Sequence, residues 1–292
     1  MTDTSFILWV QQFAQPWLTN FFLAVTALGA MEYYMVAIPI VYWLIDKHLG
    51  FRFAVFFTFS AYANSGLKYL FAVPRPPYEV RLTVQEGYSF PSGHAQGSTA
   101  FWGFLALHLR QRWAWAGAAV LIALISFSRI YLGVHYPLDI LGGIAMGALL
   151  LGGYQLLHTR VSPDKVPLKG WLWTSIGIAL ALYLFHPHGD GPVTAGFILG
   201  ALLGYALEMH TVDFSPKGRV GQNILRLLLG IGTLFVLRIS LNPLTNLFPG
   251  TTGDLARYTL LGLWASLGAP WLFVRLGLAR SNKLKKQTTS LP

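Results

Sequence analysis

Three short polar patches interrupt an otherwise apolar sequence, and each holds residues that can bind an anion or move a proton. The first patch contains Lys68 and Arg75, the second is the tetrapeptide Pro-Ser-Gly-His at 91–94, and the third covers 128–139. Charged and polar groups are energetically costly inside a membrane, and those that occur there commonly have a function. Their types and order therefore predict one site assembled from three parts of the chain.

Three cations in these patches, Lys68, Arg75 and Arg129, predict a site for a multiply charged oxyanion. Arginine suits phosphate because its planar fork can donate to two oxygens at once. The prolines around Arg75 would break the preceding helix and allow this side chain to turn back toward the site. The site is therefore expected to bind phosphate through side-chain charge.

The second patch has the pattern of a helix start. Ser92 stands where a helix N-cap is expected, and the free amides of a first helical turn bind phosphate oxygens. Gly93 would let the backbone and a ligand approach closely. His94 then lies in the first turn, where it could protonate a leaving oxygen.

In the third patch, His135 and Asp139 are separated by four positions, so they would share one face of a helix. A carboxylate on one imidazole nitrogen would fix the tautomer and leave the other nitrogen free to attack. Phosphoryl transfer needs mainly positioning and charge stabilisation, which these side chains supply. We therefore predict no metal and no cofactor.

The composition indicates that lipid surrounds most of this protein. Of its 292 residues, 54% are hydrophobic and 11% are charged, whereas a soluble domain is about a quarter charged. The chain contains no cysteine, which excludes disulfides, thiolate catalysis and cysteine-bound metals. A net charge of +10 could suit nucleic acid, but its distribution favours membrane orientation, and no nucleic-acid partner is predicted.

Hydrophobic runs of membrane-spanning length predict an all-α, polytopic bundle of about nine transmembrane helices. A short amphipathic helix at 4–17 is expected to lie at the membrane interface. The nine predicted spans are 19–45, 52–73, 94–109, 113–133, 137–158, 171–186, 192–209, 221–240 and 257–278.

Most basic residues fall in alternate loops, which predicts that these loops are cytoplasmic. The N-terminus lacks the basic region of a cleavable signal peptide, so the first helices are expected to direct insertion. An odd number of spans then places the C-terminus inside and all three patches outside, in the cytoplasmic (inner) membrane of a cell. The loop residues behind this prediction include Lys47, Arg52, Arg160, Lys165, Lys169, Arg226, Lys283, Lys285 and Lys286.

Two parts of the chain are predicted. Residues 1–158 contain the interfacial helix, five spans and all three patches, and residues 159–292 form a four-span extension of open role. The polar, proline-containing loop 159–170 separates them.

The three patches together resemble the signature of the type 2 phosphatidic acid phosphatase superfamily. Its members are also called lipid phosphate phosphatases, and they share a core with vanadium haloperoxidases. The signature is Lys, six residues, Arg-Pro, then Pro-Ser-Gly-His, then Ser-Arg, five residues, His, three residues, Asp. The sequence fits every position, within about residues 19–158.

This resemblance implies a helical-bundle core and metal-independent hydrolysis of a phosphomonoester or pyrophosphate through a phosphohistidine. By the same resemblance His135 is the nucleophile, Asp139 orients it and His94 is the general acid. The phosphate-binding residues would be Lys68, Arg75, Ser92, Gly93 and Arg129.

The sequence leaves several alternatives open. The substrate could be a polyprenyl pyrophosphate, phosphatidic acid or phosphatidylglycerophosphate. A phosphotransferase that passes the phosphate to another lipid or sugar would use the same residues. A lipid transporter or flippase would need only the cations. Outside the patches, Glu32 could pair with Lys68 or only pack, and His186, His188 and Asp190 form a polar turn or, less favoured, a zinc site. Oligomeric state is open.

Overall fold

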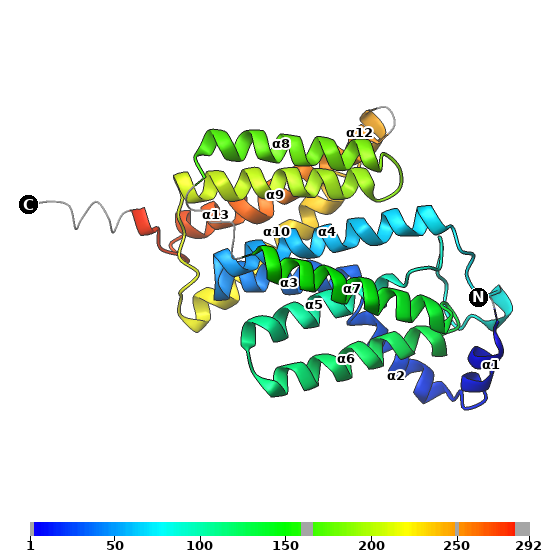
Figure 1. Ribbon diagram of the computed structural model, residues 1–292. Helices are drawn as coiled ribbons and strands as arrows, with labels where there is room; N and C mark the ends of the chain where they lie inside the picture. Colours follow the sequence, from blue (N-terminus) through cyan, green and yellow to red (C-terminus); the bar gives the residue numbers. More distant parts are fainter. Residues whose placement is uncertain (1–2, 159–165, 249–250, 284–292) are drawn as a thin grey trace, which may run out of the picture. The chain divides into compact units, whose positions relative to one another are not determined.

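A computed structural model describes residues 3–158, 166–248 and 251–283. Within these ranges the chain is helical, and its only extended pairing is an isolated bridge between Phe214 and Ser281 (Figure 1). The predicted all-α class is therefore confirmed. Four basic residues used to predict orientation lie outside the described ranges, namely Arg160, Lys165, Lys285 and Lys286.

The chain divides into two compact units. The first contains residues 1–34 and 59–161, and the second contains residues 35–58 and 162–292. The second unit thus takes a segment of the N-terminal half, which a division at residue 158 does not anticipate. The role of the C-terminal extension stays a prediction.

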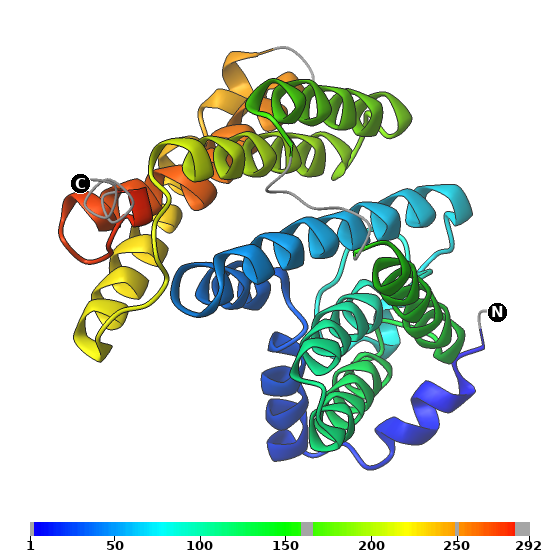
Figure 2. The same ribbon diagram turned by 60° about the vertical axis from the view of Figure 1, so that its left-hand side comes forward.

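The first unit contains all three polar patches. In Figures 1 and 2, α5 lies beside both α6 and α7, and α2 packs on α6. The 3-10 turn Tyr78–Val80 lies in the long connection from α4 to α5. The helices of this unit are α1 (Ser5–Gln11), α2 (Pro16–Ala27), the second half of α4 (Lys47–Phe71), α5 (Gly93–Leu109), α6 (Arg112–Tyr131) and α7 (Pro137–Leu157).

Local sequence explains where the site-bearing helices begin. Ser92 is the N-cap of α5, and its Oγ accepts from the Ala95 amide at 3.4 Å. Pro137 occupies the first turn of α7, where its missing amide hydrogen costs nothing. Asp139 then accepts from the Tyr136 amide at 2.8 Å, which completes the start of α7.

The second unit packs α9 (Gly191–Thr211) between α8 (Leu168–Phe185) and α12 (Thr252–Leu263). Close contact requires glycine at Gly200, because a Cβ there would lie 2.0 Å from the Thr259 carbonyl oxygen. The remaining elements are the end of α3 (Met31–Ile40), the π-helical turns η1 (Val41–Ile45) and η4 (Trp264–Gly268), α10 (Val220–Ser240), α11 (Leu244–Leu247) and α13 (Ala269–Arg275).

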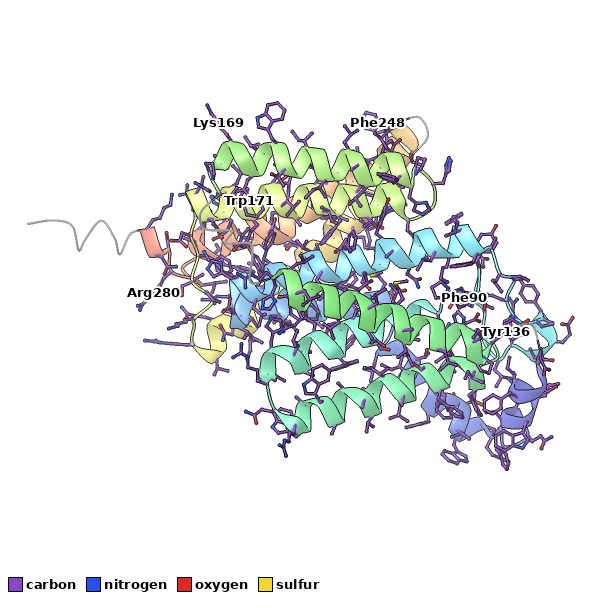
Figure 3. The ribbon with its side chains drawn as sticks, viewed as in Figure 1. Phe90, Tyr136, Lys169, Trp171, Phe248 and Arg280 are labelled. Carbon is purple, nitrogen blue, oxygen red and sulfur yellow. The ribbon has the colours of Figure 1, made fainter. Side chains whose placement is uncertain are left out.

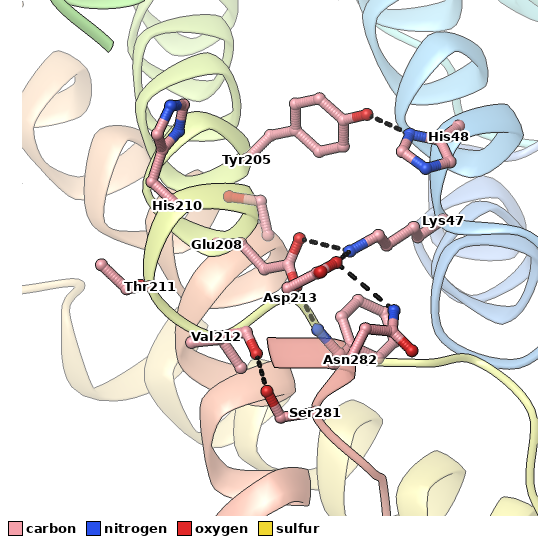
Figure 4. Close-up of polar contacts among 12 residues, drawn as sticks. Lys47, His48, Tyr205, Glu208, His210, Thr211, Val212, Asp213, Ser281 and Asn282 are labelled. Carbon is pink, nitrogen blue, oxygen red and sulfur yellow. Dashed lines mark hydrogen bonds and ion pairs between the residues drawn. The ribbon is translucent and has the colours of Figure 1, made fainter. Parts of the chain in front are cut away.

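Lys47 is not a loop residue. It begins α4, is 5% exposed, and lies 3.3 Å from Glu208 and 2.7 Å from Asp213 (Figure 4). Glu208 is fully buried and also accepts from the Phe214 amide. Arg226 likewise lies inside α10, buried against backbone carbonyls. Their burial means that Lys47 and Arg226 report packing within this unit and cannot serve as evidence for membrane orientation.

The predicted count of nine spans is not confirmed. Five described helices are long and apolar enough to cross a membrane, or six if the bent pair Pro16–Ala27 and Met31–Ile45 is one span. This pair bends by 47° within the run 19–45, which was expected to form one span. Helix α5 has only 17 residues, and the last expected span is divided among α12, η4 and α13. Hydropathy therefore found helical segments correctly but overstated how many are uninterrupted.

Candidate active site

The three polar patches meet at one end of the first unit, where α4 and α6 end and α5 and α7 begin. Successive helices that run in opposite directions bring residues distant in sequence to the same end. Phe90, which precedes the second patch, and Tyr136, which lies within the third, are both labelled at this end in Figure 3. The Ser92 amide donates to the Asp139 carbonyl at 3.0 Å, which joins the starts of α5 and α7.

His135 and Asp139 form the buried centre of the site. His135 is 1% exposed, and its Nδ1 lies 3.3 Å from Asp139 Oδ2. The predicted pairing of an imidazole with a carboxylate four positions later therefore has a geometric basis. The catalytic roles assigned to the two residues stay predictions.

The other ring nitrogen of His135 faces Arg75. Arg75 NH1 lies 3.1 Å from His135 Nε2 and 2.9 Å from the Val134 carbonyl oxygen. A guanidinium can only donate hydrogen bonds, so Nε2 must be the acceptor and carry the lone pair. Its hydrogen is then on Nδ1, toward Asp139. The surroundings thus assign the tautomer in which Nε2 is free to act as a nucleophile.

Arg129 is 2% exposed and has an unused donor. Its NH1 donates to Thr26 Oγ1 at 2.8 Å, and its NH2 donates to Gln85 Oε1 at 2.7 Å. Its Nε has no hydrogen-bond partner in the part of the chain that the structure describes. A buried donor without a partner is costly, and a phosphate oxygen would satisfy it.

The segment Gln85–Tyr88 supplies oxygen atoms to all three cations. Gln85 accepts from Arg129, the Glu86 and Gly87 carbonyls accept from Arg75 Nε at 3.0 Å, and the Tyr88 carbonyl accepts from Lys68 at 2.9 Å. These acceptors are neutral oxygens, so they leave the positive charge of the cations in place. A phosphate would supply charged oxygens to the same donors.

Gly93 and His94 begin α5 beside this cluster. A Cβ at Gly93 would lie 3.0 Å from Asn64 Oδ1. His94 is partly exposed and interacts electrostatically with Arg129, His135, Lys68 and Arg75. All eight predicted site residues therefore gather in one cluster, which comprises Lys68, Arg75, Ser92, Gly93, His94, Arg129, His135 and Asp139.

A tight turn delivers His135 to the site. Gly133 has φ +70°, and a Cβ there would lie 1.9 Å from the Val80 carbonyl oxygen, so no other residue fits without rearrangement. Gln11 of α1 donates to the carbonyls of Val80 and Tyr131 at 2.8 and 2.9 Å. The N-terminal helix thereby fixes the turn that carries the predicted nucleophile.

The electrostatics favour an uncharged His135. Burial, followed by the positive charges of Arg75, Arg129 and Lys68, lowers the pKa of His135 well below its ordinary value of 6.5. Burial and the neighbouring Arg81 lower the pKa of Arg75 to about 10. At neutral pH the site therefore combines a neutral imidazole with charged guanidinium groups, as nucleophilic attack on a phosphate requires.

Sequence reasoning missed three contributors, Thr26, Gln85 and Ser89. Ser89 Oγ lies 2.5 Å from Asp139 Oδ2 and 3.3 Å from His135 Nδ1. Its place just before the second patch was the one available signal. Gln85 lies in a loop without a recognisable pattern, and Thr26 lies within an apolar helix.

The other polar candidates do not join this cluster. Glu32 is exposed in the first turn of α3. Among the described residues, no group of three histidine, aspartate or glutamate side chains is arranged to hold a metal ion. The turn containing His186, His188 and Asp190 is among the described residues and shows no such arrangement.

Family models match both parts of the chain. Residues 49–163 match the PAP2 superfamily, and residues 192–281 match the transmembrane extension of PAP2 superfamily phosphatases. The first match contains every residue of the site cluster, and the second lies within the second unit.

Three relatives are informative. Phosphatidylglycerophosphatase B of Bacillus subtilis is 30% identical over 47% of this chain and 73% of its own length. Lipid phosphate phosphatase delta of Arabidopsis thaliana is 25% identical over 90% of this chain and 69% of its own length. A probable sphingosine-1-phosphate phosphatase of Dictyostelium discoideum is 25% identical over 77% of this chain, which spans 61% of that protein.

The helical fold, the cluster of site residues and these matches together define a class of membrane phosphatases. The chain belongs to the PAP2 superfamily of phosphatases. This chain spans between about a third and three quarters of the length of curated relatives that it matches.

Proposed function

We propose that this protein is a membrane lipid phosphatase that removes a phosphate from a lipid phosphate or pyrophosphate through a phosphohistidine at His135. The hydrogen bond from Arg75 NH1 to His135 Nε2 carries the proposal, because it places a lone pair on the nitrogen that faces the cations. Names of the relatives supply the substrate class, since they include phosphatases of lipid phosphates, sphingosine 1-phosphate and phosphatidylglycerophosphate.

In the first step, His135 Nε2 attacks phosphorus and the bond from phosphorus to the lipid oxygen breaks. His94 donates a proton to that oxygen, so a neutral lipid alcohol leaves, or a lipid monophosphate if the substrate is a pyrophosphate. The bound phosphate favours a proton on His94, because an adjacent negative charge favours the charged form of an imidazole. Arg75 exchanges its bond with Nε2 for phosphate oxygens as the lone pair is used.

In the second step, water attacks the phosphohistidine while His94 accepts its proton. The bond between Nε2 and phosphorus breaks, and inorganic phosphate leaves. Lys68, Arg75 and Arg129 supply positive charge to both transition states. We infer that this charge replaces a metal ion, and that the reaction proceeds without one.

The test is phosphate release by the purified protein in detergent with EDTA. The substrates are phosphatidic acid, phosphatidylglycerophosphate, sphingosine 1-phosphate and a polyprenyl pyrophosphate. We expect release from at least one of them, and loss of at least a thousandfold in His135→Ala and His94→Ala, since removing a group that acts in both steps is about that costly. Activity that survives His135→Ala would rule out the phosphohistidine. Label that appears on an added alcohol instead of in free phosphate would identify a transferase.

We further infer that the site lies on the outer face of the cytoplasmic membrane and the C-terminus on the inner face. The basic loops that are not buried support this orientation. The chain contains no cysteine, so a single introduced cysteine reports its own side. Val84→Cys, at a position 82% exposed beside the site, should react with an impermeant thiol reagent in intact cells. Lys217→Cys should react only after permeabilisation, and the reverse pattern would refute the orientation.

A further inference from the structure

Ser89 occupies a position between the two central side chains of the site. Its Oγ lies 2.5 Å from Asp139 Oδ2 and 3.3 Å from His135 Nδ1, and the residue is fully buried. Nδ1 therefore has two oxygen neighbours at the same distance, because Asp139 Oδ2 is also 3.3 Å away. The sequence predicts a pair, His135 and Asp139, and the structure adds Ser89 as a third member.

The direction of each hydrogen bond follows from the chemistry of its partners. A carboxylate only accepts, so the hydroxyl hydrogen of Ser89 points to Asp139. The lone pairs of Ser89 Oγ then remain for the hydrogen on His135 Nδ1. Since Arg75 must donate to Nε2, Nδ1 is the nitrogen that carries hydrogen. Ser89 thus accepts from the imidazole and donates to the carboxylate.

The backbone holds Ser89 in this place. Its amide donates to the Val73 carbonyl at 2.8 Å, two residues before Arg75. Three residues later, the Ser92 amide donates to the Asp139 carbonyl at 3.0 Å. The segment that carries Ser89 is therefore attached both to the loop before Arg75 and to the start of α7, and these bonds fix the position of the hydroxyl.

We propose that Ser89 is a positioning residue for the reaction at His135, which it holds through Nδ1 in the orientation and tautomer that nucleophilic attack requires. This proposal rests on the proposed phosphohistidine mechanism. Ser89 contacts the imidazole through Nδ1 and not through the reacting nitrogen Nε2.

The proton balance of the reaction explains why a third group is useful. When Nε2 forms its bond to phosphorus and the lipid oxygen departs, the imidazole retains its Nδ1 hydrogen and becomes positively charged. Hydrogen bonds to a charged donor are stronger than those to a neutral one. Two acceptors around Nδ1, Ser89 and Asp139, therefore stabilise the charged ring more than the neutral ring, and they release this stabilisation when water removes the phosphate.

A purely structural role is the competing explanation, because the hydroxyl of Ser89 also satisfies a buried carboxylate. The two roles predict different measurements. Loss of a structural bond would lower stability and the amount of folded protein. Loss of positioning would lower kcat and change the pH profile while KM stays the same.

The decisive variants are Ser89→Ala and Ser89→Cys. The alanine variant removes the hydroxyl, whereas cysteine fills the space with a weak hydrogen-bonding group. Ser126→Ala is the matched control, because Ser126 is equally buried on α6 and its Oγ has no partner among the described residues. Each full-length protein is purified in detergent, and kcat, KM and thermal unfolding are measured with the substrate that the wild-type protein hydrolyses best.

We expect both Ser89 variants to lose about tenfold to a hundredfold in kcat, the usual effect of losing one hydrogen bond to a charged group. KM and the unfolding temperature of Ser89→Cys should stay close to wild type. The acid limb of kcat/KM should move to lower pH, since an acceptor at Nδ1 favours the protonated imidazole and its loss disfavours it. Ser126→Ala should match the wild type in all measurements.

Unchanged kcat or an unmoved acid limb in Ser89→Cys would overturn the proposal. If Ser89→Ala fails to fold, the cysteine variant still decides. The phosphohistidine mechanism is tested separately by His135→Ala. Loss of activity in His135→Ala together with normal activity in Ser89→Cys would reject the role of Ser89 and leave the mechanism intact.

Discussion

In the second unit, Lys47 is buried with two carboxylates, Glu208 and Asp213 (Figure 4). In the first unit, Arg75 and Arg129 are buried with neutral oxygens and an imidazole nitrogen, and within the described residues neither forms an ion pair with a carboxylate. Both arrangements satisfy most donors, but only the ion pairs of Lys47 in the second unit neutralise the charge. Burying a charge without a counter-ion is expensive. The positive charge that the first unit leaves uncompensated therefore favours binding of an anion that arrives from outside.

The comparison predicts that a site cation matters for activity more than for stability. Arg129→Ala should lower kcat/KM about a thousandfold, by analogy with the loss of an arginine that stabilises a phosphoryl transition state. Its unfolding temperature should not fall, because the substitution also removes an uncompensated buried charge. Phosphate release and thermal unfolding in detergent are the measurements.

Arg129→Lys is the control for this prediction. It keeps the charge but loses the planar fork, so it should recover only part of the activity. Activity of Arg129→Ala within about tenfold of wild type would show that the positive charge in the first unit is not reserved for the substrate.

The counterpart in the second unit should behave in the opposite way. Lys47→Ala leaves Glu208 buried without its partner and should destabilise the protein by about 3–5 kcal/mol. The activity of the molecules that remain folded should not change. Thermal unfolding, together with activity per folded molecule, measures both effects.

Replacing both partners provides the control. Lys47→Met combined with Glu208→Leu should recover most of the lost stability, because no fully buried carboxylate is then left without a partner. Asp213 also loses Lys47, but its side chain is 21% exposed and can be solvated. A double variant no more stable than Lys47→Ala would mean that this ion pair has a role beyond neutralising charge.

A smaller effect should follow from placing a carboxylate beside a cation of the first unit, as the second unit does with Lys47. Gln85 Oε1 accepts from Arg129 at 2.7 Å, so Gln85→Glu would place a carboxylate on a phosphate-binding cation. We expect KM to rise about tenfold, because the substrate must now displace a charge-assisted bond. Steady-state kinetics measure this effect.

Gln85→Ala is the matched control and should leave KM unchanged or lower, since it removes a neutral competitor. Equal KM values in the glutamate and alanine variants would indicate that Gln85 moves away before substrate binds and that the segment Gln85–Tyr88 does not compete with phosphate.

The eight candidate site residues could be recognised in the sequence because their chemistry is conspicuous in an apolar chain. Lys68, His94 and Asp139 are recognisable by type, and their positions at helix ends follow from local patterns. Ser89 and Gln85 were missed, because their roles depend on the path of a loop that no periodicity describes.

Membrane spans show the same limit. The runs that became α6 to α10 have the expected lengths, so hydropathy found them. It could not show that the first run bends between α2 and α3, or that α5 stops after 17 residues. Nor could it reveal that Lys47 and Glu208 neutralise each other, since a lysine near the end of an apolar run has the same pattern whether it meets water or a carboxylate.

The direction of the four site-bearing helices has an electrostatic consequence of its own. The N-termini of α5 and α7 present partial positive charge, whereas the C-termini of α4 and α6 would present partial negative charge to the same site. Lys68 and Arg129 lie in the last turns of α4 and α6. Each cation offsets the dipole of its own helix, so all four helix ends attract phosphate. Without these side chains, the C-termini of two of the four helices would repel it.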